Sequence, residues 1–121
     1  MSNLNELHKD HVEWLSQMDF FQDEIKFFQN KLFRAILDDE GSIINEGLIA
    51  EYRELFFLTL KRIDDIRHDI LAHEQMIKRE GRENFESPHD HESVAQHVTD
   101  METNFMELRK RFKSFAAHHM H

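Results

Sequence analysis

The sequence predicts an all-α protein, an antiparallel bundle of three long helices. Three stretches of the chain repeat apolar residues at alternating spacings of three and four positions, which places them along one side of a helix. The chain contains only three Gly and one Pro, too few for the many turns of an all-β fold. Short connections make successive helices antiparallel. We therefore expect residues 1–121 to form a single helical-bundle domain.

The first helix is predicted over residues 4–38. Asn3 is a suitable N-cap with Glu6 completing a capping box, and Gly41 suits the left-handed conformation that follows a helix. Its predicted core positions are Leu4, Leu7, His11, Trp14, Met18, Phe21, Ile25, Phe28, Leu32 and Ala35. His11 is the one exception in an otherwise apolar seam.

The second helix is predicted over residues 43–80 and the third over residues 88–117. Ser87 is the expected N-cap of the third helix, and Pro88 takes its first position, where the missing N–H costs nothing. The predicted core positions of the second helix are Ile49, Tyr52, Phe56, Ile63, Ile66, Ile70, His73 and Ile77. Those of the third helix are Val94, Val98, Met101, Phe105, Leu108, Phe112 and Phe115.

Composition excludes several classes of function. With 15 basic and 24 acidic residues the chain carries a net charge of −9, which repels nucleic-acid phosphates. It has no Cys, so neither disulfides nor thiolate metal sites can form. No apolar run approaches the roughly 20 residues of a membrane span, and the N-terminus lacks the layout of a secretory signal. We expect a cytoplasmic protein that binds neither nucleic acid nor membrane.

Ten histidines are the most informative feature of the sequence. In the predicted bundle the first helix starts where the second ends and the third begins, and the register places His11, His73 and His97 in one layer. Neutral imidazole is the commonest metal ligand in proteins, and carboxylates often accompany it in bundle cores. The predicted metal-site residues are His8, His11, Asp69, His73, His97 and Glu102. We expect a divalent transition metal (Zn, Fe, Mn or Cu) in a structural, storage, sensing or redox role.

The predicted architecture resembles that of hemerythrin-like cation-binding bundles, which are short, helical and rich in His and carboxylates. That family uses four helices and spacings such as His-x-x-x-Glu and His-x-x-x-His. Here His68 and His73 are five residues apart, and so are His97 and Glu102. The resemblance therefore concerns architecture alone and assigns no residue a role.

A second feature is a set of large apolar residues that lie off the predicted core stripes. They are Phe20 and Phe27 on the first helix and Phe57 and Leu60 on the second. Exposed apolar side chains in a row indicate a partner surface, so we expect a homo-oligomer. The alternative function is a metal-free helical interaction module whose histidines are incidental or make it pH-responsive. The sequence has no phosphate-binding loop, nucleophile elbow or His-Glu-x-x-His motif, and it leaves catalysis undecided.

Overall fold

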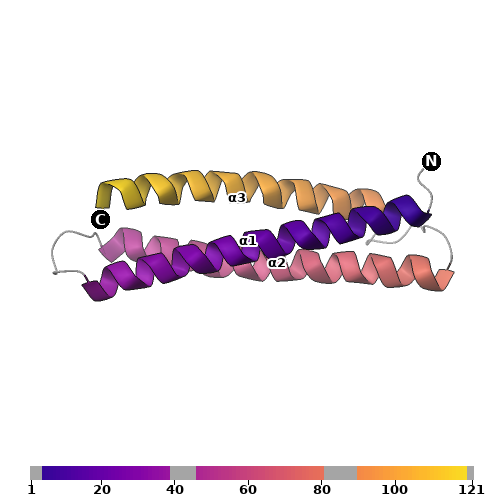
Figure 1. The fold of residues 1–121 in the computed structure, drawn as a ribbon, viewed down its shortest axis with the longest axis horizontal. Coiled ribbons are helices and arrows are strands. Elements are labelled where there is room, and N and C mark those ends of the chain that lie inside the picture. The colour runs from indigo at the N-terminus through magenta and orange to yellow at the C-terminus, as the bar shows by residue number, and fades with distance from the viewer. Residues whose placement is uncertain (1–3, 39–45, 81–89, 120–121) are drawn as a thin grey trace.

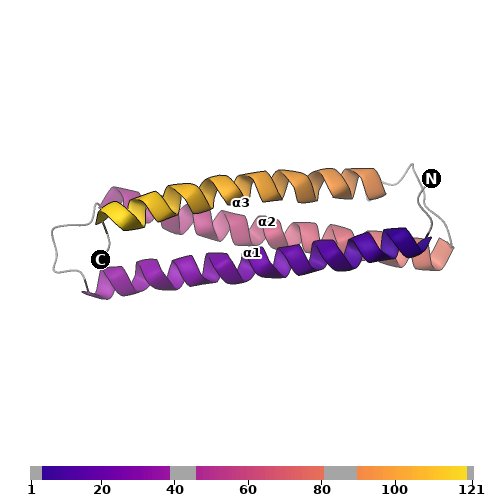
Figure 2. The same cartoon turned by 45° about the horizontal axis from the view of Figure 1, so that its top comes forward.

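The computed structural model describes residues 4–38, 46–80 and 90–119. These segments form three helices, α1 (Leu4–Asp38), α2 (Glu46–Glu80) and α3 (His91–His119). The helices lie side by side along their length, and α2 runs opposite to α1 and α3 (Figures 1 and 2). The predicted all-α antiparallel three-helix bundle is confirmed.

The bounds of α1 are those predicted, and α2 is described from Glu46, since its predicted start at residue 43 falls outside the described residues, whereas α3 starts later than predicted. The Asp90 side chain accepts a hydrogen bond from the Ser93 backbone N–H at 2.8 Å, so Asp90 occupies the N-cap position and the helix starts at His91. This start lies three residues after the predicted one. The predicted caps that fall outside the described residues are Asn3, Gly41, Ser87 and Pro88.

The main core is a column of aromatic and aliphatic side chains supplied by all three helices, and a smaller cluster of Leu7, Met76 and Ile77 lies apart from it. Phe21 of α1 stacks on Phe105 of α3 with ring centroids 4.4 Å apart. Further along, the Phe112 ring lies 5.0 Å from Phe28 and 5.1 Å from Phe56, so one aromatic layer joins α1, α2 and α3. Alternating spacings of three and four bring these residues to the same side of each helix, and burial of their apolar surface holds the bundle together.

The apolar residues predicted to drive self-association lie on two different sides of the bundle. Phe20 borders a groove between α1 and α3, whereas Phe57 borders a groove between α1 and α2 together with Phe33. Phe20, Phe27 and Phe57 are exposed, but Leu60 is half-buried and packs against the core. None of the described helices has an apolar stretch long enough to cross a membrane.

Adjacent phenylalanines on α2 test this description of the core. Phe56→Ala should lower the free energy of unfolding by about 3–5 kcal/mol, because the buried ring leaves a cavity. Phe57→Ala, next to it but exposed, should change stability by less than about 0.5 kcal/mol. Urea unfolding followed by circular dichroism measures both variants. Equal losses would contradict the assignment of core and surface.

Candidate metal centre

Three histidines, one from each helix, meet at the end of the bundle where α1 starts, α2 ends and α3 starts (Figure 1). His11 and His73 are buried, with 1% and 0% of their surface exposed, and His91 is half-buried. The ring centroids are 4.7 Å apart for His11 and His73, 5.5 Å for His73 and His91, and 5.8 Å for His11 and His91. Each ring offers one nitrogen such that the three nitrogens lie within 4.8 Å of one another. This group could hold a metal ion.

Local sequence explains why these rings point inward. His11 lies four residues after Leu7 in the core stripe of α1, and His73 lies three after Ile70 in that of α2. His91 lies three residues before Val94, so it extends the stripe of α3 by one position at its N-terminal end. Each histidine therefore takes a place in the packing pattern that an apolar residue would otherwise fill.

Glu74 of α2 holds the orientation of His11. The Glu74 carboxylate contacts Nδ1 of His11 and also lies 2.6 Å from Nδ1 of His8. A carboxylate only accepts hydrogen bonds, so the His11 nitrogen that faces it carries the proton. In the neutral ring the other nitrogen, Nε2, then keeps its lone pair, which is the form that binds metals.

The same contacts set the charge of Glu74. Burial raises the pKa of the Glu74 carboxyl, but hydrogen bonds from His11 and His8, together with electrostatic attraction to the two rings, lower it by more than burial raises it. The net result is a pKa below its ordinary value of 4.5, so the carboxylate stays ionised at neutral pH.

Asp10 of α1 acts on His91 as Glu74 acts on His11. The His91 Nε2 lies 2.9 Å from an oxygen of Asp10, so this nitrogen donates and Nδ1 of the neutral ring keeps the lone pair. Two of the three clustered rings are thus held by a carboxylate on one nitrogen. A carboxylate–histidine pair of this kind fixes the tautomer and increases the basicity of the other nitrogen.

The third ring, His73, lies directly against the first. Its Nδ1 is 2.6 Å from Nε2 of His11, which is hydrogen-bonding distance. Since Nε2 of His11 holds a lone pair, His73 donates in this arrangement. Two nitrogens on one tetrahedral Zn²⁺ would be about 3.3 Å apart, given Zn–N bonds of about 2.0–2.1 Å. To admit an ion between these two nitrogens, the rings would need to separate by less than 1 Å, roughly, and His73 would need to carry its proton on Nε2 instead of Nδ1.

Trp14, the single tryptophan, borders the cluster. Its ring lies 4.8 Å from that of His91 and 5.7 Å from that of His11, measured between centroids. The Trp14 ring therefore covers one side of the histidine cluster.

The remaining residues of the predicted site lie elsewhere. His8 is exposed and contacts Glu74 rather than the clustered rings. Asp69 and His97 approach each other to 3.5 Å on the α2 and α3 surfaces and form a separate pair. Glu102 is exposed and borders the groove between α1 and α3. Of the six predicted residues, the structure brings His11 and His73 together in the group that could hold a metal.

Sequence reasoning missed His91, Glu74 and Asp10. The structure places His91, six residues before His97, level with His73, because α3 is displaced along its axis by more than a helical turn from the assumed register. Spacing alone could have found His91, since it continues the three-and-four pattern of α3 and His97 does not. Glu74 and Asp10 are each adjacent in sequence to a buried histidine, but their contacts depend on the register between helices.

Comparison of the chain with models of known protein families, with curated proteins and with solved structures found no match.

The lowered pKa of Glu74 predicts a contribution to stability that is lost in acid. Because its pKa is lowered on folding, its ionised form stabilises the protein above about pH 4.5, and this contribution disappears as the pH falls through the folded pKa. Glu74→Gln should therefore lower the melting temperature at neutral pH, measured with EDTA present, and the difference from wild type should shrink below about pH 4.5.

The matched control for this experiment is Glu54→Gln, an exposed glutamate on the same helix, α2. It should leave the melting temperature nearly unchanged at every pH. A Glu74→Gln variant that melted at the wild-type temperature at neutral pH would contradict the assigned contacts.

Proposed function

We propose that the protein binds one divalent transition-metal ion through His11, His73 and His91, and that the ion ties the three helices together at this end of the bundle. The observation that carries the proposal is the convergence of three imidazoles, one from each helix, with ligand atoms within 4.8 Å of one another. A chance cluster of surface histidines would not place one ring in each of three core stripes, with two of the rings fully buried.

The chemistry of the donors favours particular ions. The carboxylates nearest the rings, Glu74 and Asp10, contact ring nitrogens, so the donor set is three neutral imidazoles. Imidazole suits Zn²⁺, Cu²⁺, Fe²⁺ and Ni²⁺, with affinity rising from Fe²⁺ to Cu²⁺, whereas Mg²⁺, Ca²⁺ and Mn²⁺ prefer oxygen ligands. We therefore propose Zn²⁺ or Cu²⁺ as the bound ion.

Charge balance supports a divalent ion. Three neutral imidazoles bring no charge of their own, and a buried dication needs compensation. Glu74 and Asp10 supply two negative charges in contact with the ligand rings. These carboxylates also orient the rings, so each contributes to both affinity and geometry.

Three ligands leave a fourth position on a tetrahedral ion for water or another small ligand. His91 is partly exposed, with 18% of its side-chain surface accessible, which gives this position a route to solvent. We propose a structural or sensing role, since an ion held by all three helices couples metal occupancy to the stability of the bundle.

Metal-dependent melting tests the proposal. The full chain should be used with the tail residues His118, His119 and His121 changed to Gln, because they could bind ions independently. Zn²⁺ at about a hundred times its dissociation constant should stabilise the fold by about 2.7 kcal/mol, or a shift in Tm on the order of 10 °C. Calorimetric titration should give one ion per chain, and Mg²⁺ should produce neither effect.

Two histidines of α2 provide a matched pair of variants for this test. His73→Gln should abolish the Zn²⁺-dependent shift because it removes a buried ligand. His68→Gln should retain the shift, because the His68 side chain is 72% exposed and turns to Asp64 of its own helix, away from the clustered rings. Equal shifts in the two variants, or no shift in the tail-substituted protein, would exclude the proposed site.

The single tryptophan can locate the bound ion. Cu²⁺ quenches indole fluorescence at short range, and Trp14 lies next to both His11 and His91. We expect saturable quenching of Trp14 with the stoichiometry of the calorimetric titration, and loss of this quenching in His91→Gln. Quenching that persisted in His91→Gln would place the ion elsewhere.

A further inference from the structure

The sides of α1 and α3 that face away from α2 form a second apolar surface, which the metal site does not use. We call it the α1–α3 face and define it by Val12, Phe20, Phe27, Glu102, Met106 and Arg109. A groove of about 620 Å³ runs along it, with the buried Phe21 and Phe105 at its base. Phe20 and Met106 stand at its rim, with 56% and 52% of their surface exposed.

The apolar residues of this face repeat along α1. Phe20 and Phe27 are seven residues apart, which places them on the same side of the helix, and Val12 lines the same groove. All three are more than half exposed. α1 is therefore apolar on two sides, one against the core of its own chain and one turned to solvent. A helix with two apolar sides is suited to packing against neighbours on both.

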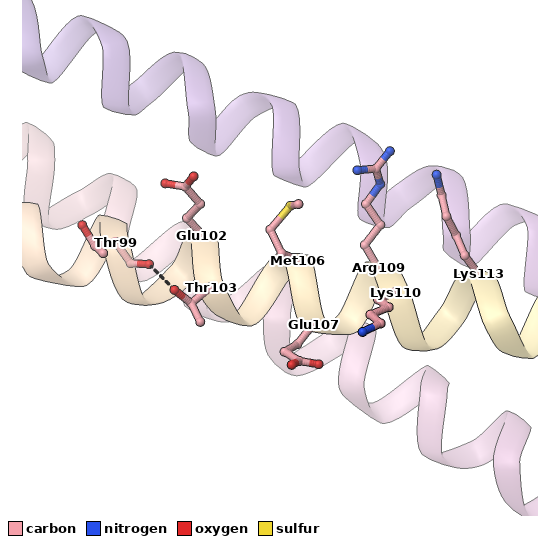
Figure 3. Close-up of a pocket in the computed structure, with 8 residues that line it drawn as sticks. All are labelled: Thr99, Glu102, Thr103, Met106, Glu107, Arg109, Lys110 and Lys113. Atoms are coloured by element: carbon pink, nitrogen blue, oxygen red, sulfur yellow. Dashed lines mark hydrogen bonds between the residues drawn. The ribbon is translucent and has the colours of Figure 1, made fainter.

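The charges that α3 contributes to this face are separated along the helix, whereas α1 places Glu24 beside Arg109 at one end and both Lys9 and Glu13 at the other. Figure 3 shows Glu102, Met106, Arg109 and Lys113 projecting from one side of α3, with the acid before Met106 and the cations after it. Arg109 also lies 3.8 Å from Glu24 of α1, which holds its guanidinium at the groove. Glu13 lines the groove at the same end as Glu102, next to Lys9 at the edge.

We propose that the α1–α3 face binds a second copy of this chain about a twofold axis that passes near Met106. Such an axis reverses the order of charges, so that Glu102 of each copy comes level with Arg109 of the other. The apolar residues Phe20 and Met106 of both copies then meet at the centre. A twofold contact requires a surface complementary to itself, and this charge order meets that requirement.

Charge separation matters here because the chain as a whole carries −9. Two such molecules repel each other unless their contact surfaces concentrate opposite charges. The pairing would place α1 and α3 of one copy antiparallel to those of the other and would cover the groove with helices. At this contact the two helices of one copy would pack antiparallel against the two helices of the other.

The groove between α1 and α2 provides the comparison. It is also partly apolar, with Phe33 and Phe57 exposed, but its charged residues Arg53 and Glu54 are neighbours in sequence. A twofold axis at that groove would therefore not bring separated opposite charges of the two copies level with each other. Phe57→Ser is therefore a matched control for Phe20→Ser.

Sedimentation equilibrium of the full chain with EDTA measures the proposed dimer. The wild type should approach twice the chain mass of 14.7 kDa as its concentration rises. Phe20→Ser should raise the dimer dissociation constant at least about tenfold, while Phe57→Ser should leave it unchanged. A wild type that stays monomeric, or a dimer that is lost in Phe57→Ser and kept in Phe20→Ser, would overturn the proposal.

Charge reversal tests the twofold geometry itself. Glu102→Lys alone places cations opposite each other across the interface, and Arg109→Glu alone places acids opposite each other, so each variant should be monomeric. Mixed together they should form a one-to-one heterodimer, because both opposite-charge pairs are restored, and native mass spectrometry can count it. Circular dichroism checks that both variants fold. Dimerisation of each variant at the wild-type level, or no heterodimer in the mixture, would contradict the proposed arrangement.

Discussion

The fold and the candidate site both depend on the side-chain spacing of the three core stripes. A residue in a stripe is carried into the interior whatever its polarity, because the helix is anchored by the apolar residues before and after it. His11 and His73 reach 1% and 0% exposure in this way. Burying a polar ring without partners costs free energy, so the interior must supply hydrogen bonds or a ligand. The contacts of Glu74 with His11 and of His11 with His73 meet that demand.

These contacts explain why a bundle end can become a binding site without a specialised loop. Each of the three helices contributes one imidazole from a rigid position, and neighbouring carboxylates orient two of the rings. Rigid elements hold ligand geometry better than loops do. At the other end of the bundle the same stripe positions carry aromatic residues, such as Phe112 between Phe28 and Phe56, and the hydroxyl of the buried Tyr52 donates a hydrogen bond to the backbone carbonyl of Arg111. One packing pattern thus produces a hydrophobic core along most of its length and a polar cluster at one end.

The two proposals use different surfaces and are independent. The metal site lies in the interior at the end where α1 starts, and the α1–α3 face lies along the side of the bundle. Metal binding by a monomer would support the metal site alone. Dimerisation without metal would support the twofold contact alone. If both hold, the dimer would carry two metal sites related by the twofold axis. Metal binding at the proposed site would stabilise the start of α1, whose Glu13 borders the groove of the α1–α3 face, so the two sites share a helix.

The sequence by itself determined the number and extent of the helices, since spacings of three and four and the scarcity of Gly and Pro depend only on local order along the chain. It also identified His11 and His73 as core residues, because each occupies a stripe position. Only the tertiary structure decided which third histidine joins them, which carboxylates face the rings, and which apolar residues share a face. His91, and not the predicted His97, lies with His11 and His73, and Phe20 and Phe57 lie at different grooves. Both outcomes depend on the axial and rotational register between helices. That register follows from the packing of large side chains such as Phe21 on Phe105, which no spacing along a single helix specifies.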